Sequence, residues 1–409
     1  MYFFYYIPVG ISAELRKFPS MTLFLSLICA FIFFVNKYLS AFVPLDFMNL
    51  VYVPEYSGAL TAVTAAFLHM GYLHLIGNLL YLIFLGRYVE DRMGPVMYVL
   101  LFVTSAWVGN YCQGWYNIHI LGREYVGIIG ASGAVSAILG FFAVRFLLAR
   151  LKIAYWVFMP LQAYTRAGIV EVPAILAVVL WFLIQSAKGL VQYGGGWENV
   201  AYVTHITGFM WGIAFSLLLG EYGKGKLEAL WIRSQKRFAD CDYYAAQADL
   251  LKYLDQCPGD GRALASLARV QLVIGDNTGA RDNYRRGCEL LLESMQRGQA
   301  EELYREAVRG FEDLTLGEDA QLDLAFGLER NLKPELALIA YANFERRYPH
   351  HPEAPFTLLR KANLHWNTFS DSEEAAGCYR RLVTLYPGDS WADFAREQIR
   401  VLEAPQAAS

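Results

Sequence analysis

The sequence predicts an all-α protein in which a bundle of six membrane-spanning helices is followed by a soluble array of shorter helices. Two kinds of observation support this fold class. Of the 409 residues, 56% are hydrophobic and only 18% are charged, whereas soluble proteins have about 25% charged residues. The charges are also unevenly distributed, because the first 220 residues hold only 11 of the 35 basic and 8 of the 38 acidic residues. A boundary between two different kinds of domain is therefore expected near Gly220.

Six apolar stretches before this boundary are long enough, or nearly so, to cross a hydrocarbon core, which takes about 20 residues. They are Met21–Val43, Thr61–Leu85, Pro95–Trp115, Val126–Leu148, Val170–Val191 and Asn199–Leu219. Arg16 and Lys17 precede the first stretch as in a signal peptide, but no small-residue cleavage site follows it. We therefore expect the first stretch to be retained as a span.

The orientation of the spans follows from the basic residues of the loops, since positively charged loops stay in the cytoplasm. Basic residues gather before span one, between spans two and three, between spans four and five, and after span six. Both termini are therefore expected in the cytoplasm. The expected domains are a cytoplasmic N-terminal segment (1–20), a transmembrane domain (21–220) and a cytoplasmic helical domain (226–403). The short loops favour a multi-pass protein of a prokaryotic plasma (inner) membrane.

Four polar residues of the spans are expected at one depth in the lipid bilayer. In this topology spans two, four and six run from outside to inside. Ser132 and His205 then lie about six residues into their spans, or about 9–10 Å below the outer surface. His74 and Asn78 fall in the outer half of span two. Because polar residues within a membrane usually face the bundle interior or a water-filled cavity, these side chains from three helices indicate one site.

Three motifs in these spans resemble those of rhomboid intramembrane serine proteases, over about residues 10–220. They are Gly130-Ala-Ser132-Gly133 in span four, His69-xxxx-His74-xxx-Asn78 in span two, and His205-xx-Gly208-xxx-Gly212 in span six. Their combined occurrence, in order and on the appropriate spans, is specific, although the first motif alone is a weak signal.

The resemblance implies a serine endopeptidase with Ser132 as nucleophile and His205 as general base. A serine hydroxyl needs such a base, and imidazole titrates near operating pH. It also implies an oxyanion hole made by Asn78, His74 and the backbone N–H of Ser132. The residues expected to support the site by close helix packing are Gly130, Gly133, Ser136, Gly208 and Gly212. The implied substrates are single-span membrane proteins, cut in or near their transmembrane helices.

One departure from the family affects the base. Many rhomboid proteases have a tyrosine four residues after the nucleophile that stacks on the histidine, and here this position is Ser136. We therefore expect another group to hold His205. Two alternatives stay open: a rhomboid-like scaffold that binds membrane proteins with little or no catalysis, and small residues that serve packing alone. No feature predicts a cofactor, a metal site or nucleic-acid binding, since no HExxH motif or nearby intramembrane carboxylate is present.

The region after the boundary resembles tetratricopeptide repeats. Tyr348-Pro and Tyr386-Pro recur 38 residues apart, each after a helix with a basic pair, and Cys257-Pro-Gly-Asp indicates an earlier copy. Repeats of this length predict an α-solenoid of three to five helical hairpins with a concave groove. The groove is expected to bind a cytoplasmic protein or peptide partner, and the alternative is a structural appendage. Residues 404–409 are expected to be a disordered tail.

Overall fold

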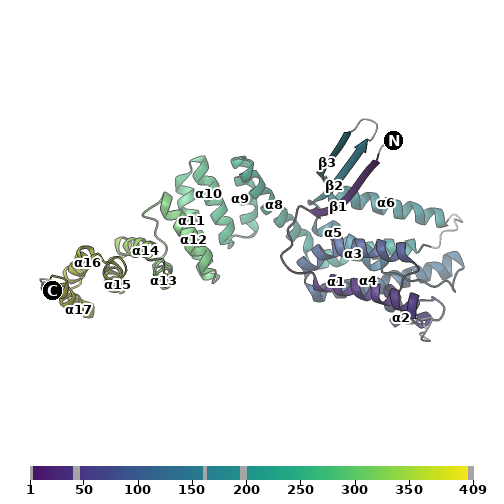
Figure 1. Cartoon of the computed structure of the whole chain (residues 1–409), viewed down its shortest axis with the longest axis horizontal. Coiled ribbons are helices and arrows are strands. Elements are labelled where there is room, and N and C mark those ends of the chain that lie inside the picture. Colours follow the sequence, from purple (N-terminus) through teal and green to yellow (C-terminus); the bar gives the residue numbers. More distant parts are fainter. Residues whose placement is uncertain (1–2, 40–46, 160–163, 194–199, 404–409) are drawn as a thin grey trace. The chain divides into compact units, whose positions relative to one another are not determined.

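The computed structural model describes residues 3–39, 47–159, 164–193 and 200–403 (Figure 1). The chain forms two compact units, Met1–Ala229 and Leu230–Ser409, called here the membrane unit and the helical-repeat unit. The tail predicted at 404–409 and the predicted span ends at Val43 and Asn199 lie outside the described residues.

Each of the six predicted spans contains a helix of the membrane unit. These are α1 (Ser20–Phe34), α3 (Tyr72–Met93), α4 (Pro95–Tyr116), α5 (Ser132–Arg145), α6 (Ala174–Tyr193) and α7 (Tyr202–Leu218). Among the described residues, four helices are long and apolar enough to cross a membrane: α1 with its π-helical extension, α3, α4 and α6. α7 meets the criterion only together with α8 (Glu221–Ala239), across a bend of 75°, and α5 is shorter. The unit is thus a multi-pass helical bundle, and four or five helices of its described part have spanning length. The predicted count of six spans stays a prediction.

Two predicted spans begin later in the structure than in the sequence analysis. The segment expected to open span two forms the short helix α2 (Ala59–Thr64) and a 3-10 turn (Ala65–Phe67), and α3 begins only at Tyr72. The segment expected to open span four is a loop up to Ala131. Gly130 in this loop has a φ of +121°, which a right-handed helix does not allow. Apolar composition alone could not distinguish these segments from the helices that follow them.

The short helix α5 lies inside the bundle. Its 14 residues give a length of about 21 Å, which is less than a hydrocarbon core of about 30 Å. Eleven of them are buried by other parts of the chain. α5 packs most extensively against α7, and also against α3 and α4. A helix enclosed in this way does not need to match the thickness of the bilayer.

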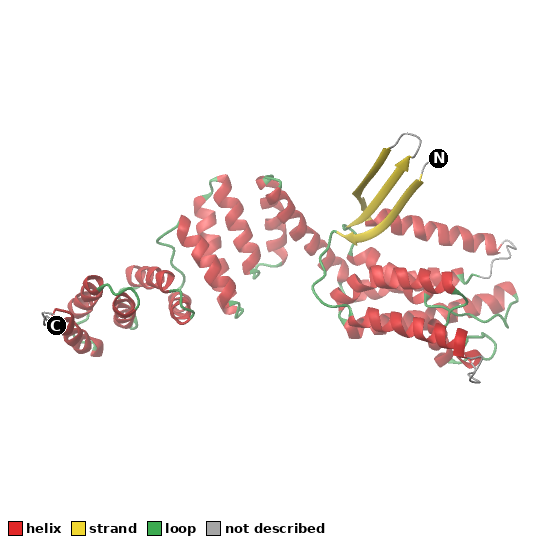
Figure 2. Cartoon of the chain, viewed as in Figure 1, coloured by secondary structure: helices red, strands yellow, loops and turns green. Residues whose placement is uncertain are grey.

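The described chain is mainly helical, as predicted, but it also contains a small antiparallel sheet that was not predicted (Figure 2). The sheet consists of β1 (Phe3–Ile11), β2 (Arg150–Met159) and β3 (Tyr164–Pro173), in the order β1-β2-β3. The start of the predicted N-terminal segment thus forms a strand. Val170, which was predicted to open span five, lies in β3. These segments are rich in aromatic and β-branched residues, which suit strands. The pairing of Ile11 with Leu151 joins segments far apart in sequence, so that no local pattern shows it.

Buried ion pairs connect the first half of α8 to the C-terminal ends of α3 and α5. Glu228 pairs with Arg92 at the end of α3 and with Arg145 at the end of α5. Glu221 also pairs with Arg145, at 2.8 Å. Burial would raise the pKa of Glu228, but hydrogen bonds from Arg92 and Arg145 and the charges of both guanidinium groups lower it overall. The membrane unit therefore continues into α8, beyond the boundary predicted at residue 220.

Two acidic residues of the same region fix the N-terminus of α1. Glu90 accepts hydrogen bonds from the backbone N–H groups of Met21 and Thr22 at 2.9 and 2.7 Å. Asp91 accepts them from Arg16 and Lys17. The first N–H groups of a helix have no partner within the helix, and Pro19 at the N-cap supplies no side-chain acceptor. Glu90 of α3 takes this role, and Asp91 holds the segment that leads into α1.

The described part of the helical-repeat unit is a succession of helices of 13 to 17 residues. They are α9 (Tyr243–Gln256), α10 (Gly261–Ile274), α11 (Asn277–Glu293), α12 (Arg297–Gly310), α13 (Glu318–Arg330), α14 (Pro334–Arg347), α15 (Ala354–Asn367), α16 (Ser372–Leu385) and α17 (Ser390–Glu403). Each packs against the next in sequence (Figure 1). Asp260, Asp276 and Asp371 cap three of these helices with their side chains. Buried leucine, alanine and tyrosine side chains form the core between the helices.

Candidate active site

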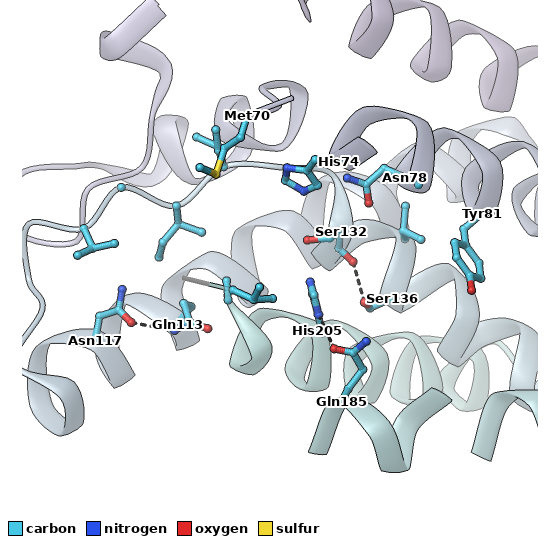
Figure 3. A pocket seen from close by; sticks show the side chains of 18 of the residues that line it. Met70, His74, Asn78, Tyr81, Gln113, Asn117, Ser132, Ser136, Gln185 and His205 are labelled. Atoms are coloured by element: carbon cyan, nitrogen blue, oxygen red, sulfur yellow. Dashed lines mark hydrogen bonds between the residues drawn. The ribbon is translucent and has the colours of Figure 1, made fainter. Parts of the chain in front are cut away.

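A cavity of about 500 Å³ in the membrane unit contains the polar residues singled out by the sequence (Figure 3). His74 and Asn78 reach it from α3, Ser132 and Ser136 from α5, and His205 from α7. These three helices begin at the cavity, and α3 and α5 end at the ion pairs around Glu228. The polar side chains that were predicted to share one depth thus lie in one cavity, at the N-terminal ends of the three helices.

Ser132 is the first residue of α5, rather than a residue six positions inside a helix. Its backbone N–H is one of the N-terminal groups that no carbonyl of the same helix can accept, and the helix dipole favours negative charge there. Gly130 shapes the approach to Ser132. A Cβ at Gly130 would lie 2.6 Å from Cε1 and 2.7 Å from Nε2 of His74. The absence of a side chain at residue 130 therefore lets the His74 ring lie directly against the loop that carries Ser132.

The remaining glycines of the motifs lie behind the cavity, between α5 and α7. A Cβ at Gly208 would lie 2.3 Å from the carbonyl oxygen of Gly133, and one at Gly212 would lie 1.9 Å from that of Ala137. A Cβ at Gly133 would meet Cγ2 of Thr204 at 2.6 Å. The two backbones are thus in direct contact, as small residues permit in membrane helices. This contact brings the N-terminal ends of α5 and α7 together.

His205 is held by Gln185 and Tyr202, neither of which was singled out from the sequence. Its Nδ1 lies 2.9 Å from Oε1 of Gln185 on α6. The ring of Tyr202, one turn earlier on α7, meets the imidazole edge-on, with 6.2 Å between centroids. Ser136 does not replace the family's tyrosine, because its hydroxyl donates to the carbonyl oxygen of Ser132 at 2.7 Å. The group that we expected to hold His205 in place of the tyrosine is thus a side chain of α6.

Gln113 of α4 caps the N-terminus of α7. Its Oε1 accepts hydrogen bonds from the backbone N–H groups of Val203 and Thr204, at 3.0 and 3.2 Å. Its Nε2 donates to Asn117 at 2.8 Å. Ala201, at the N-cap of α7, has no side-chain acceptor for this purpose. The buried Gln113 side chain therefore fixes the first turn of α7, which carries His205.

Asn78 presents a hydrogen-bond donor to the cavity. The side chain is 6% exposed, and Nδ2 has no hydrogen-bond partner within the described part of the chain. A buried donor without a partner is costly, and such groups concentrate at functional sites. His74 lies in the same cavity, with the ring of His69 against its other side at 5.1 Å between centroids. His69 itself does not line the cavity.

The arrangement supplies the groups needed for nucleophilic attack by a serine. Between the two described residues Ser132 and His205 there is no hydrogen bond, and catalytic hydrogen bonds are often long before substrate binds. Arg123 is the only Lys, Arg, Asp or Glu among the described lining residues. The histidine of this site is thus oriented by a neutral amide, in contrast to the carboxylate of soluble serine hydrolases.

The residues missed by sequence reasoning had one signal in common. Gln185 and Gln113 are uncharged polar residues within largely apolar helices. Polar side chains in membrane spans usually face the bundle interior, so the same argument that selected Ser132 and His205 applies to both glutamines. Their hydrogen-bond partners on α7, in contrast, are visible only in the structure.

Comparison with known proteins gives matches for the membrane unit. Residues 57–222 match the family model described as the Rhomboid domain. The "RHOMBOID-like protein 1" of Arabidopsis thaliana is 28% identical over 161 residues, which are 39% of this chain and 35% of that protein. The "Rhomboid protein 1, mitochondrial" of Saccharomyces cerevisiae is 29% identical over 167 residues, 40% of this chain and 42% of that protein.

A third relative, the "Rhomboid-like protein 11, chloroplastic" of Arabidopsis thaliana, is 26% identical over 172 residues, 41% of this chain and 54% of its own length. The chain thus spans about a third to a half of the length of these relatives. Two of them are named for mitochondria and chloroplasts, so the matches do not support the prokaryotic plasma membrane predicted from the short loops. Together the family model and the relatives support the assignment of the membrane unit to the rhomboid family.

Proposed function

We propose that the chain is an intramembrane serine endopeptidase that hydrolyses peptide bonds in or near the transmembrane helices of other membrane proteins. The observation that carries the proposal is the meeting of Ser132, His205, Asn78 and His74 in one cavity inside a membrane bundle. A nucleophile, a base and unpaired donors in a concave site are the set required for acyl transfer. The match of residues 57–222 to the Rhomboid domain supports the same reaction.

In the proposed mechanism, Ser132 Oγ attacks the scissile carbonyl carbon while Nε2 of His205 takes the hydroxyl proton. The same nitrogen then gives this proton to the leaving amine. In the second half of the reaction, water attacks the acyl-enzyme while Nε2 takes its proton, and Nε2 then returns this proton to Ser132 Oγ. Asn78 Nδ2, His74 and the backbone N–H of Ser132 would stabilise the oxyanion. Donors that are already held in place stabilise developing charge strongly, because they need no reorganisation during the reaction.

The proposed substrates are single-span proteins whose transmembrane helix unwinds locally. The carbonyl groups of an intact helix are hydrogen-bonded within the helix, and lipid offers no alternative partner. A segment that leaves its helix at the cavity would find water and polar groups there instead. The termini are proposed to lie in the cytoplasm, as the distribution of basic residues indicates.

The test is cleavage of a panel of single-span proteins by the purified full-length chain in detergent or bilayers. We expect the native protein to cut, and Ser132→Ala and His205→Ala to be inactive. Ser105→Ala is a matched control, because Ser105 is buried on α4 and does not line the cavity. If the folded native protein cuts no member of the panel, or if Ser132→Ala still cuts, the proposal is wrong, and a binding scaffold becomes the better account.

We also propose that the helical-repeat unit is a tetratricopeptide-like solenoid that binds an acidic protein segment. A cavity of about 380 Å³ between its helices is lined by four arginines (Arg281, Arg285, Arg346 and Arg347) and two aspartates (Asp282 and Asp313). The aspartates pair with Arg281 and Arg285. Arg346 and Arg347 have no ion-pair partner among the described residues. This excess of positive charge favours a carboxylate-rich partner.

A fluorescent hexaglutamate peptide tests the second proposal with the full-length protein. We expect binding that weakens with salt, and at least about tenfold weaker binding for Arg346→Glu. Arg330→Glu serves as control, because Arg330 is an exposed arginine of α13 outside this cavity. Equal loss in both variants, or no preference over a hexalysine peptide, would contradict a specific acidic site.

A further inference from the structure

We infer that Gln185 is a positioning residue, which holds the imidazole of His205 in the tautomer that can act as a base toward Ser132. The inference rests on the proposed function for its role in catalysis. The hydrogen bond itself is a property of the folded chain and can be tested without a substrate.

The atoms that meet determine the tautomer. Oε1 of Gln185 lies 2.9 Å from Nδ1 of His205 (Figure 3). An amide oxygen can only accept a hydrogen bond, and a neutral imidazole carries its proton on one nitrogen. Nδ1 must therefore be the donor. The lone pair is then left on Nε2, the nitrogen that has to take the proton of Ser132.

The packing of α6 on α7 places the amide at this position. Trp181 and Phe182 of α6 contact Phe209 of α7, with ring centroids 5.7 and 5.0 Å apart. Gln185 lies one turn after Trp181, and His205 lies one turn before Phe209. Residues one turn apart occupy the same face of a helix, so the aromatic contact and the polar contact belong to one continuous interface. The aromatic contacts thus set the height at which Gln185 meets the histidine.

The orientation of the His205 imidazole depends on this hydrogen bond, because the described part of the site lacks the carboxylate that orients the histidine of a Ser-His-Asp triad. Among the described lining residues there is no carboxylate that could orient the imidazole. Ser136 is engaged with the carbonyl oxygen of Ser132, and Tyr202 meets the ring with its edge. Among the described residues, Gln185 is the hydrogen-bonding partner of His205. Without this partner both tautomers become accessible, and only one of them leaves Nε2 unprotonated.

The first experiment uses the full-length protein labelled with ¹⁵N-histidine in lipid bilayers, where ¹⁵N chemical shifts distinguish the two tautomers. The signals of His205 are assigned by their loss in His205→Ala. We expect the native protein to show a protonated Nδ1 and an unprotonated Nε2. Gln185→Leu removes the acceptor and is expected to give a mixture of tautomers. Gln185→Glu keeps an acceptor and is expected to retain the native tautomer.

The second experiment measures kcat and KM for cleavage and the rate at which a fluorophosphonate labels Ser132. For Gln185→Leu we expect kcat and the labelling rate to fall about 10- to 100-fold, which is less than most of the about 10²–10⁴-fold that general-base catalysis contributes, because a share of the molecules keeps the competent tautomer. KM should change by less than about twofold. Gln185→Glu should restore both rates to within about threefold of native. Ser186→Ala is the matched control, because Ser186 is the next residue of α6 and does not line the cavity.

The two experiments separate failure of the inference from failure of the proposed function. A native His205 with its proton on Nε2, or the same tautomer in the native protein and in Gln185→Leu, overturns the inference even if the protein cleaves substrates. The expected tautomers in a protein that cleaves nothing uphold the assignment of Gln185 and contradict only the proposed function. Equal losses in Gln185→Leu and Gln185→Glu, with native tautomers in both, would show that Gln185 fills space rather than accepting a hydrogen bond from His205.

Discussion

Gly208 of α7 lies against the carbonyl oxygen of Gly133 on α5 so closely that a Cβ at residue 208 would approach this oxygen to 2.3 Å. Gly212, one turn later, has the same relationship with Ala137 at 1.9 Å. The catalytic pair proposed here comes from these same two helices. The distance between Ser132 and His205 therefore depends on two places where the backbones touch.

A methyl group at this contact should separate the helices. For Gly212→Ala we expect the free energy of unfolding to fall by about 1–3 kcal/mol, as for overpacked cores, together with loss of cleavage. Thermal unfolding in detergent measures the first effect and a substrate assay the second. Gly223→Ala is the control, because a Cβ at this residue of α8 meets no atom within 4 Å. Equal stability of the two variants would show that α5 and α7 can move apart at no cost.

Replacement of Gly130 by alanine should affect the site more than the fold. Alanine is strained at a φ of +121°, and its Cβ would displace the ring of His74. We expect loss of cleavage by at least about tenfold, since the oxyanion donors would be misplaced. Gly122→Ala is the comparison, because Gly122 also has a positive φ but free space around a Cβ. Equal losses of activity in the two variants would mean that backbone strain alone explains the effect.

Asn78→Ala removes the donor without a partner in the cavity. We expect kcat to fall by about 10²–10³-fold with little change in KM, because an oxyanion donor acts on the transition state. Tyr81→Phe is the control, since Tyr81 lines the same cavity and has no role in the proposed mechanism. Steady-state kinetics on one substrate decides the point. A rise in KM at constant kcat would instead indicate that Asn78 binds the substrate in its ground state.

Glu228→Gln should destabilise the membrane unit in a pH-dependent manner. The change leaves Arg92 and Arg145, both nearly buried, without one of their carboxylates, and we expect a loss of about 3 kcal/mol at neutral pH. The pKa of Glu228 is lowered from its ordinary value of 4.5, so its stabilising effect is present above this pH and is lost as the pH falls through the lower folded-state value. The difference in thermal stability between native and variant should therefore shrink below about pH 4.5.

The matched control for this prediction is Glu14→Gln. Glu14 is exposed, and its carboxylate has no ion pair among the described residues. This variant should behave like the native protein at each pH. A constant difference between native and Glu228→Gln across the range would contradict an electrostatic origin.

The main fold could be predicted because its signals are local. Long apolar runs identified a helix in each of the six segments, and amphipathic periods identified the helices after residue 220. The sheet escaped prediction because Ile11 and Leu151 pair across more than a hundred residues. The late starts of α3 and α5 escaped it because the segments before them are as apolar as the helices that follow. Gly130 carried a usable signal, although its motif was interpreted as part of a span.

The candidate site could be predicted as a set of residues but not as a geometry. The motifs singled out His74, Asn78, Ser132 and His205, and the structure gathers all four in one cavity. The departure at Ser136 predicted that another group holds the histidine, without indicating which one. Gln185 accepts its bond only because α6 packs on α7 at a certain height, and that height depends on contacts between helices.

The shortness of α5 also has a consequence for the surrounding lipid. A helix of about 21 Å exposed to a bilayer would force thinning or tilting, since its hydrophobic length falls short of the core. Here α5 is largely buried among α3, α4 and α7, so its own hydrophobic length does not have to match that of the bilayer. The depth of Ser132 is then set by α3 and α7 rather than by membrane thickness. Bilayers of different acyl-chain length should tilt the outer helices and leave the nucleophile at the same height relative to its base.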